Sequence, residues 1–240
     1  MTGTPGSSDQ GAGRVENDVQ HMPVNPHIIT RMAAPRTDTR DRIIRSAARL
    51  FQRQGYLGTG LVQVVEECAA PRGSIYFHFR GGKEELALEV IELWARGTVD
   101  LVDICVDSAE DVAGAVVVLA QTLADTIERS GFVQGCAVAT MALEVTPASE
   151  ALREACDRLF REWQGSLRHH LIHAGVSVER AESLASLIVS ALEGALILAR
   201  TSLSPEPVVI AGQELSTLVS ACLATPSSRN SRATDTQERA

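Results

Sequence analysis

The sequence lacks the features that would place it in several large classes of protein. No uncharged apolar run reaches the roughly 18 residues that a membrane-spanning helix requires. The N-terminus also has no continuous apolar segment of the kind that signal peptides carry. We therefore expect a cytoplasmic protein. The five cysteines are odd in number, widely spaced and without a Cys-x-x-Cys pair, which argues against a disulfide framework or a zinc site.

Sequence motifs of common enzymes are missing as well. We find no nucleophile elbow, glycine-rich phosphate loop or zincin helix, so we expect no catalytic residues and no cofactor. His169 and His173 would share one helix face, as a metal site requires, but no carboxylate or cysteine stands at a completing spacing. We interpret them as part of a solvated or capping histidine cluster and predict no metal. Cys136 is either a packed thiol, which we favour, or a redox-sensing one.

Strand signals are absent too, since no run alternates steadily between apolar and polar residues. Apolar residues recur instead at helical spacing, and a hydrophobic content of 45% is ample for a core. The sequence therefore predicts an all-α fold of about nine helices. Outside the segment 55–79, which is treated below, the predicted helices cover residues 39–54, 83–105, 107–128, 135–145, 150–174, 179–203 and 207–223.

Charge is distributed unevenly along the chain. The net charge of −8 argues against a protein that coats nucleic acid indiscriminately. From Arg36 to Lys83, however, there are nine basic and four acidic residues, so this segment has a net charge of +5 and the remainder −13. One end of the chain is therefore suited to phosphate. Arg31 and Arg36 could reach a minor groove, although a solvated tail is the interpretation that we favour.

The segment 55–79 has the pattern of a helix-turn-helix. Its first half has one apolar helix face opened by Thr59 or Gly60, and Pro71 cannot continue that helix but suits the first turn of another. In the second half, Ile75 and Phe79 lie one turn apart and can dock on the first helix. The apolar face of the first helix consists of Leu61, Val64, Val65 and Cys68, and the outward side of the second includes Arg72, Gly73, Ser74, Tyr76 and Phe77.

The residues of this segment and of those that follow it resemble a known family. Gly-Tyr-x-x-Thr at 55–59, Gly-x-Ile-Tyr-x-His-Phe at 73–79 and Lys-Glu-Glu-Leu at 83–86 resemble the N-terminal domain of TetR-family transcriptional regulators. Gly-Cys-Ala-Val-Ala at 135–139 is similar to the LmrA/YxaF-like branch of that family. The resemblance implies a three-helix helix-turn-helix DNA-binding domain, followed by a helical ligand-binding and dimerisation bundle.

The domain organisation predicted from these observations has four parts. Residues 1–36 form a disordered leader and residues 224–240 a disordered tail, because both are poor in apolar residues. The DNA-binding domain covers 37–83 and the regulatory and dimerisation domain 84–223. The helix 179–203 carries many small residues, which suit either a close dimer contact or simply its own core.

The function that the resemblance implies is a dimeric repressor, released from double-stranded operator DNA by a small apolar effector. The alternative is a helical dimer whose bundle has an enzymatic or metal-carrier role beside a vestigial DNA domain. The DNA-binding residues implied are Thr59, Gln63, Arg72, Gly73, Ser74, Tyr76, Phe77, His78 and Lys83. The expected effector pocket is lined by Trp94, Met141, Glu144, Phe160 and Trp163. The expected dimer interface consists of Leu184, Ile188, Leu192, Ala195 and Ala199.

Overall fold

The computed structural model describes residues 39–145 and 149–224. Within these ranges it contains nine α-helices and no strand, which confirms the all-α prediction. The predicted leader, 1–36, and all but the first residue of the predicted tail, 224–240, lie outside the described residues.

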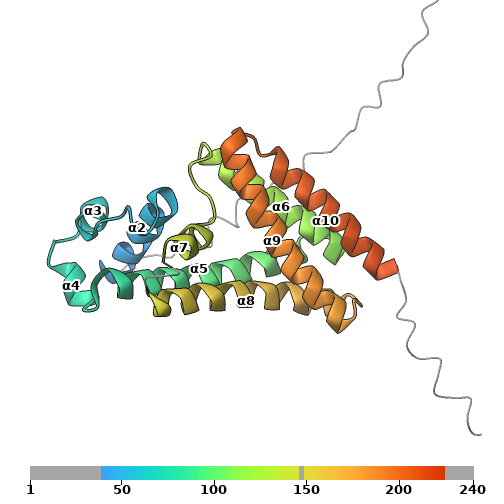
Figure 1. Cartoon of the computed structure of the whole chain (residues 1–240), viewed down its shortest axis with the longest axis horizontal. Coiled ribbons are helices and arrows are strands. Elements are labelled where there is room, and N and C mark those ends of the chain that lie inside the picture. Colours follow the sequence, from blue (N-terminus) through green and yellow to red (C-terminus); the bar gives the residue numbers. More distant parts are fainter. Residues whose placement is uncertain (1–38, 146–148, 225–240) are drawn as a thin grey trace, which may run out of the picture.

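The helices are arranged as a small group at one end of the molecule and a larger bundle at the other (Figure 1). The small group contains α2 (Thr39–Gln54), α3 (Leu61–Glu67) and α4 (Ser74–His78). The long helix α5 (Gly82–Asp107) leads from this group into the bundle (Figure 1). The remaining helices are α6 (Val112–Arg129), α7 (Ala137–Val145), α8 (Glu150–His173), α9 (Val178–Ser202) and α10 (Glu206–Ala224).

Side-chain caps fix the start of several helices. The Asp111 carboxylate accepts a hydrogen bond from the backbone N–H of Gly114 at 2.7 Å, so α6 begins at Val112 and not at the predicted Asp107. The predicted start was too early because α5 continues to Asp107. Ser149 and Ser177 cap α8 and α9 in the same way. The other long helices begin and end within two residues of their predicted bounds.

Two hydrophobic cores hold the chain together. The first joins the three small helices to the start of α5, to α7 and to the beginning of α8, and it contains Phe51, Val64 and Phe79. The second lies among the rest of α5, α6, α8, α9 and α10. Cys136 and Phe160 pack against both. The end formed by the three small helices therefore shares its core with α7 and part of α8, although the predicted domain boundary lies at residue 83.

Two of the bundle helices are unusually apolar. By length and composition alone, α9 and α10 could cross a membrane, but core helices of soluble proteins meet the same criterion. In their most apolar stretches, 44% of α9 and only 22% of α10 is buried within the protomer. Both helices therefore leave apolar surface uncovered within the protomer.

Candidate nucleic-acid interface

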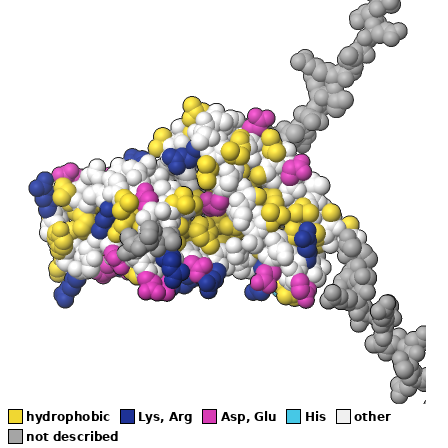
Figure 2. Space-filling view, viewed as in Figure 1, with side chains coloured by type: hydrophobic (Ala, Val, Ile, Leu, Met, Phe, Trp, Pro, Cys, Tyr) yellow, Lys and Arg dark blue, Asp and Glu magenta, His cyan; other side chains and the backbone are white. Residues whose placement is uncertain are grey.

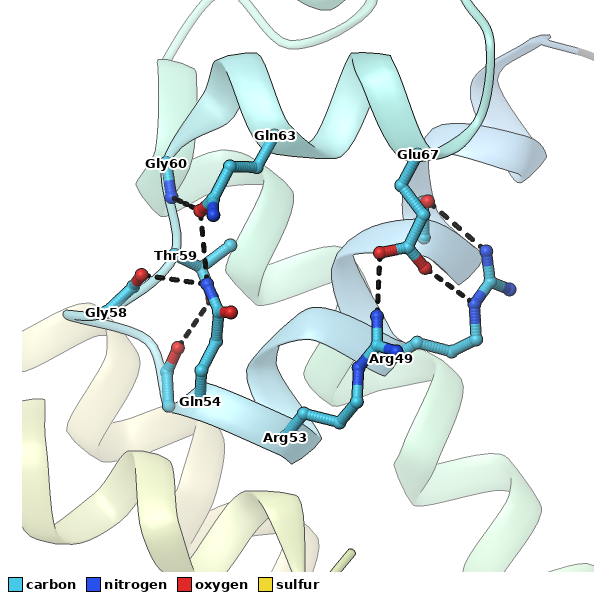
Figure 3. Close-up of polar contacts among 10 residues, drawn as sticks. Arg49, Arg53, Gln54, Gly58, Thr59, Gly60, Gln63 and Glu67 are labelled. Carbon is cyan, nitrogen blue, oxygen red and sulfur yellow. Dashed lines mark hydrogen bonds and ion pairs between the residues drawn. The ribbon is translucent and has the colours of Figure 1, made fainter. Parts of the chain in front are cut away.

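Arginines on α2 hold α3 in place. Arg49 and Arg53 both reach the Glu67 carboxylate at the end of α3, with N–O distances of 2.9 and 2.8 Å (Figure 3). Arg42 donates to the backbone carbonyl of Cys68 at 3.4 Å, where a helix C-terminus favours a cation. Three of the nine basic residues between Arg36 and Lys83 are therefore engaged within the protein. We call the three residues Arg49, Arg53 and Glu67 the arginine clasp.

The start of α3 is held by a second group of contacts. Gly60 is the N-cap, and the Gln63 side-chain oxygen accepts from its backbone N–H at 3.0 Å (Figure 3). The Gln54 amide donates to that same oxygen at 3.1 Å. Gln63 remains exposed. Thr59 is only 2% exposed and its hydroxyl donates to the Gly55 carbonyl at 2.7 Å. The predicted DNA contact at Thr59 is therefore corrected, because its hydroxyl is used inside the turn.

The turn between α3 and α4 orients the second helix. Ala69 takes a positive φ of 51°, and the N–H of Ala70 closes the end of α3 on the carbonyl of Val65. Ile75 and Phe79 are then 2% and 0% exposed, so the predicted docking of α4 is confirmed. The side of α4 that faces away from this core is open to solvent.

The open side of α4 brings most of the predicted DNA-binding residues together. Tyr76 is 65% and Phe77 77% exposed, and His78 packs edge-on against the Phe77 ring. Arg72 pairs with Glu66 at 3.1 Å, but both side chains are so exposed that the pair contributes little. Arg72 is therefore free to exchange Glu66 for another anion. In Figure 2, dark-blue basic side chains lie among apolar ones at the end of the molecule that α3 and α4 occupy.

Lys83 lies near the start of α5 and is the only lysine of the chain. Its Nζ stands 4.4 Å from the centre of the Tyr56 ring, a cation–π distance. Burial lowers the pKa of Lys83, and the Glu144 carboxylate partly offsets this by raising it. The Lys83 ammonium group therefore lies beside the helix-turn-helix, where a point charge is suited to a phosphate.

The predicted effector residues are only partly brought together. Phe160 and Trp163 are neighbours on one side of α8, and Trp163 is 5% exposed. Met141 is 1% exposed within the first core, and Trp94 packs partly buried against that core. Glu144 faces the DNA-binding end, where it accepts from the N–H of Leu57 at 2.8 Å. Its carboxylate is thus engaged with the turn before α3, and its place in an effector pocket stays a prediction.

An apolar hollow lies instead between α5, α6, α8 and α9. None of the five predicted effector residues lines it. One polar side chain does: His170, whose Nε2 is 2.8 Å from the Asp103 carboxylate. Across the part of the chain that the structure describes, no group of three or more His, Cys, Asp or Glu is placed to hold a metal ion. The apolar walls include Val102, Cys105, Val116, Leu119, Leu167 and Ile188.

Three buried polar groups lack partners, and sequence reasoning named only one of them, Trp163, as a site residue and missed Ser166 and Glu193. Among residues 39–145 and 149–224, the buried side-chain atoms without a hydrogen-bond partner are Trp163 Nε1, Ser166 Oγ and Glu193 Oε1. Burial raises the pKa of Glu193, and the nearby Cys136 thiol lowers it by hydrogen bonding. Glu193 is the only acid between Glu182 and Glu206. That isolated charge was the signal that could have found it.

Cys136 is a packed thiol. Burial raises its pKa well above the ordinary value, and Glu193 raises it further. A thiol that keeps its proton is a poor nucleophile. Of the two interpretations left open by the sequence, the packed thiol fits this environment.

The five predicted dimer residues lie inside the protomer. Leu184, Ile188, Leu192, Ala195 and Ala199 are 0–5% exposed in the second core. Side chains that are already covered by their own chain have no surface left for a partner, so this assignment is corrected. The exposed apolar residues on the other side of α9 are Leu187, Ile197 and Leu198.

A helix-turn-helix whose second helix is exposed, joined by a long helix to an α-helical bundle, is the architecture of a DNA-binding transcriptional regulator. Residues 43–90 match the family model for bacterial regulatory proteins of the tetR family. Residues 112–214 match the model for the C-terminal domain of LmrA/YxaF-like transcriptional regulators. The chain belongs to the TetR family of transcriptional regulators, in its LmrA/YxaF-like branch, as the sequence resemblance predicted.

Relatives and a solved structure agree with this assignment. The chain is 34% identical to the HTH-type regulator YxaF of Bacillus subtilis over 77% of this chain and 96% of that one. It is 35% identical to LmrA of the same organism over 72% and 92%. The fold is similar to that of a cysteine mutant of the TetR-family regulator CifR, complexed with 26-bp double-strand operator DNA. That comparison has a TM-score of 0.60 and 24% identity, and covers 77% of this chain and 98% of the other.

Proposed function

We propose that this regulator is a dimeric repressor that leaves its operator when a small molecule binds in the helical bundle. The observation that carries its DNA-binding role is the open side of α4, where Tyr76 and Phe77 are well exposed beside Arg72. Large apolar side chains exposed next to an arginine are typical of a surface that closes on a partner. A recognition helix inserts such a surface into a major groove. The contacts proposed are Gln63, Arg72, Gly73, Ser74, Tyr76, Phe77, His78 and Lys83.

A dimer is proposed through α9 and α10. Leu187, Ile197 and Leu198 are 45%, 58% and 59% exposed, and Ile210 on α10 is 50% exposed. Gly194, on the same side of α9 as Leu187 and Leu198, has no atom within 4 Å of where a Cβ would stand, so a second helix could approach closely. Two-fold pairing would set two recognition helices on half-sites roughly 34 Å apart.

An effector site is proposed in the bundle, where Trp163 and Ser166 of α8 and Glu193 of α9 each bury a polar atom without a partner. A mostly apolar interior with a few unpaired polar groups is typical of small-molecule sites. The indole N–H needs an acceptor and the serine hydroxyl can serve either role, whereas the protonated form of Glu193, which burial favours, can donate. An apolar molecule with a few polar atoms would satisfy them. To release the operator, such a ligand must bind more tightly to the conformation that does not fit DNA than to the one that does. Operator binding then weakens ligand binding by the same factor.

Genomic footprinting with the purified protein tests the DNA-binding proposal. A protected, two-fold-symmetric site of nanomolar-range affinity at physiological salt is expected. Uniform weak retention on all fragments would contradict it. Compounds that raise the melting temperature of the protein are then tested for release of that operator, with Glu193→Gln as the variant expected to lose the response.

A further inference from the structure

Glu144 connects α7 to the turn that precedes α3. Its Oε2 accepts the backbone N–H of Leu57 at 2.8 Å, across 87 residues of sequence. Its Oε1 lies over Gly55, so that a Cβ added there would stand 2.0 Å away. Leu57 itself is exposed. The contact therefore joins two parts of the molecule that the local sequence does not join.

The same carboxylate influences the start of α5. Its charge acts on the Lys83 ammonium, which lies over the ring of Tyr56, the residue between Gly55 and Leu57. Tyr56 in turn packs against Phe51 of α2, with ring centres 5.7 Å apart. The Glu144 carboxylate of α7 thus accepts a hydrogen bond from the turn and acts on the charge of Lys83. Tyr56 connects both to α2.

The other end of α7 meets the regulatory bundle. The thiol of Cys136, just before α7, lies close enough to Glu193 of α9 for each group to shift the pKa of the other. The neighbouring Gly135 lies against Arg200 of α9, and its carbonyl accepts from the Gln52 amide of α2 at 3.2 Å. A short helix held at both ends moves as a unit, so a displacement at Glu193 would be felt at Glu144.

We propose that Glu144 is a positioning residue for operator binding: its carboxylate fixes the 55–57 turn and Lys83 in the DNA-binding arrangement, and α7 carries changes at Glu193 to that contact. The inference rests on the proposed function, because it explains how the bundle governs the DNA-binding end. Glu144 is proposed to act through the turn and Lys83, not by contact with DNA.

The first test follows the Leu57 amide by hydrogen exchange in the full-length protein. Glu144→Ala removes the acceptor, so exchange at Leu57 should accelerate roughly tenfold, as loss of one charge-assisted hydrogen bond implies. Glu144→Gln keeps an acceptor and should stay near the unmodified protein. Glu162→Ala removes a charge from an exposed position on α8 and is the matched control. Unchanged exchange at Leu57 in Glu144→Ala would overturn the proposal.

The second test uses the single lysine. Reductive methylation with a carbon-13 label gives one lysine side-chain signal, from Lys83, whose pKa can be titrated. Both Glu144→Ala and Glu144→Gln should lower that pKa, because each removes the charge that raises it. Glu162→Ala should leave it unchanged. An unaltered Lys83 pKa in both Glu144 variants would overturn the electrostatic half of the proposal.

The third test measures transmission without a ligand. Operator affinity is compared in the unmodified protein, Glu193→Gln, Glu144→Ala and the double variant. If α7 transmits, Glu193→Gln changes affinity much less once Glu144 is removed, although distant sites ordinarily act additively. Additive effects would overturn transmission. A protein that binds no operator at all would instead overturn the proposed function, while the Leu57 exchange would still report on the contact.

Discussion

Replacing Gly55 by alanine should destabilise the protein more than the same change at a comparable glycine. Gly55 has φ of +77°, and the left-handed conformation costs an L-residue about 1–2 kcal/mol. The added Cβ would also stand 2.0 Å from Glu144 Oε1, which no structure tolerates. The end of the Glu144 side chain must then shift, and we expect it to give up the Leu57 N–H, at a further cost of about 1–2 kcal/mol. The total expected is about 2–4 kcal/mol.

Gly131→Ala provides the matched control. Gly131 has φ of +65°, but no atom lies within 4 Å of where its Cβ would stand, so only the conformational cost applies. Urea unfolding followed by circular dichroism, at one fixed protein concentration because dimerisation adds to stability, gives both values. In a Glu144→Ala background, Gly55→Ala should fall to about the cost of Gly131→Ala, about 1–2 kcal/mol. Equal costs at both glycines in the unmodified background would refute the reasoning.

Three further predictions concern other parts of the molecule. Arg72→Ala should weaken operator binding by about 1–3 kcal/mol if Arg72 reads a base edge, with helix content unchanged by circular dichroism. Leu198→Glu should give monomers in sedimentation because it would bury a charge between helices, whereas Val117→Glu on α6 should leave the dimer intact. Burial raises the pKa of Cys105 and Cys156 from 9.0 to about 11, so the folded state keeps protons that the unfolded state loses. The free energy of unfolding should therefore fall as pH rises from about 9 towards 11, less steeply in Cys156→Ala.

Helix positions and their buried sides were predictable because apolar spacing records them directly. Val64, Val65, Ile75 and Phe79 are buried as the pattern of 55–79 indicated. Helix starts were less secure: Asp107 and Asp111 are both plausible caps, and only the structure shows that Asp111 accepts from Gly114. Local sequence thus specified the elements better than their ends.

The dimer surface could not be predicted from pattern, because α9 has apolar residues on both sides. Leu192 and Leu198 look alike in sequence, yet the first is buried in its own protomer and the second is 59% exposed. The contacts of Thr59 and Glu144 could not be predicted for another reason. Their partners, the Gly55 carbonyl and the Leu57 N–H, are backbone groups. Backbone partners leave no signature in side-chain composition.

The arginine clasp limits how many ions the protein can displace from DNA. Each phosphate that a basic side chain neutralises releases condensed cations, and contributes about 0.9 to the slope of log affinity against log salt. Arg49 and Arg53 already have Glu67 as a partner, and Arg42 already donates to the Cys68 carbonyl. The salt dependence of operator binding should therefore be shallower than the nine basic residues between Arg36 and Lys83 suggest. Glu67→Gln would loosen the clasp and steepen that dependence.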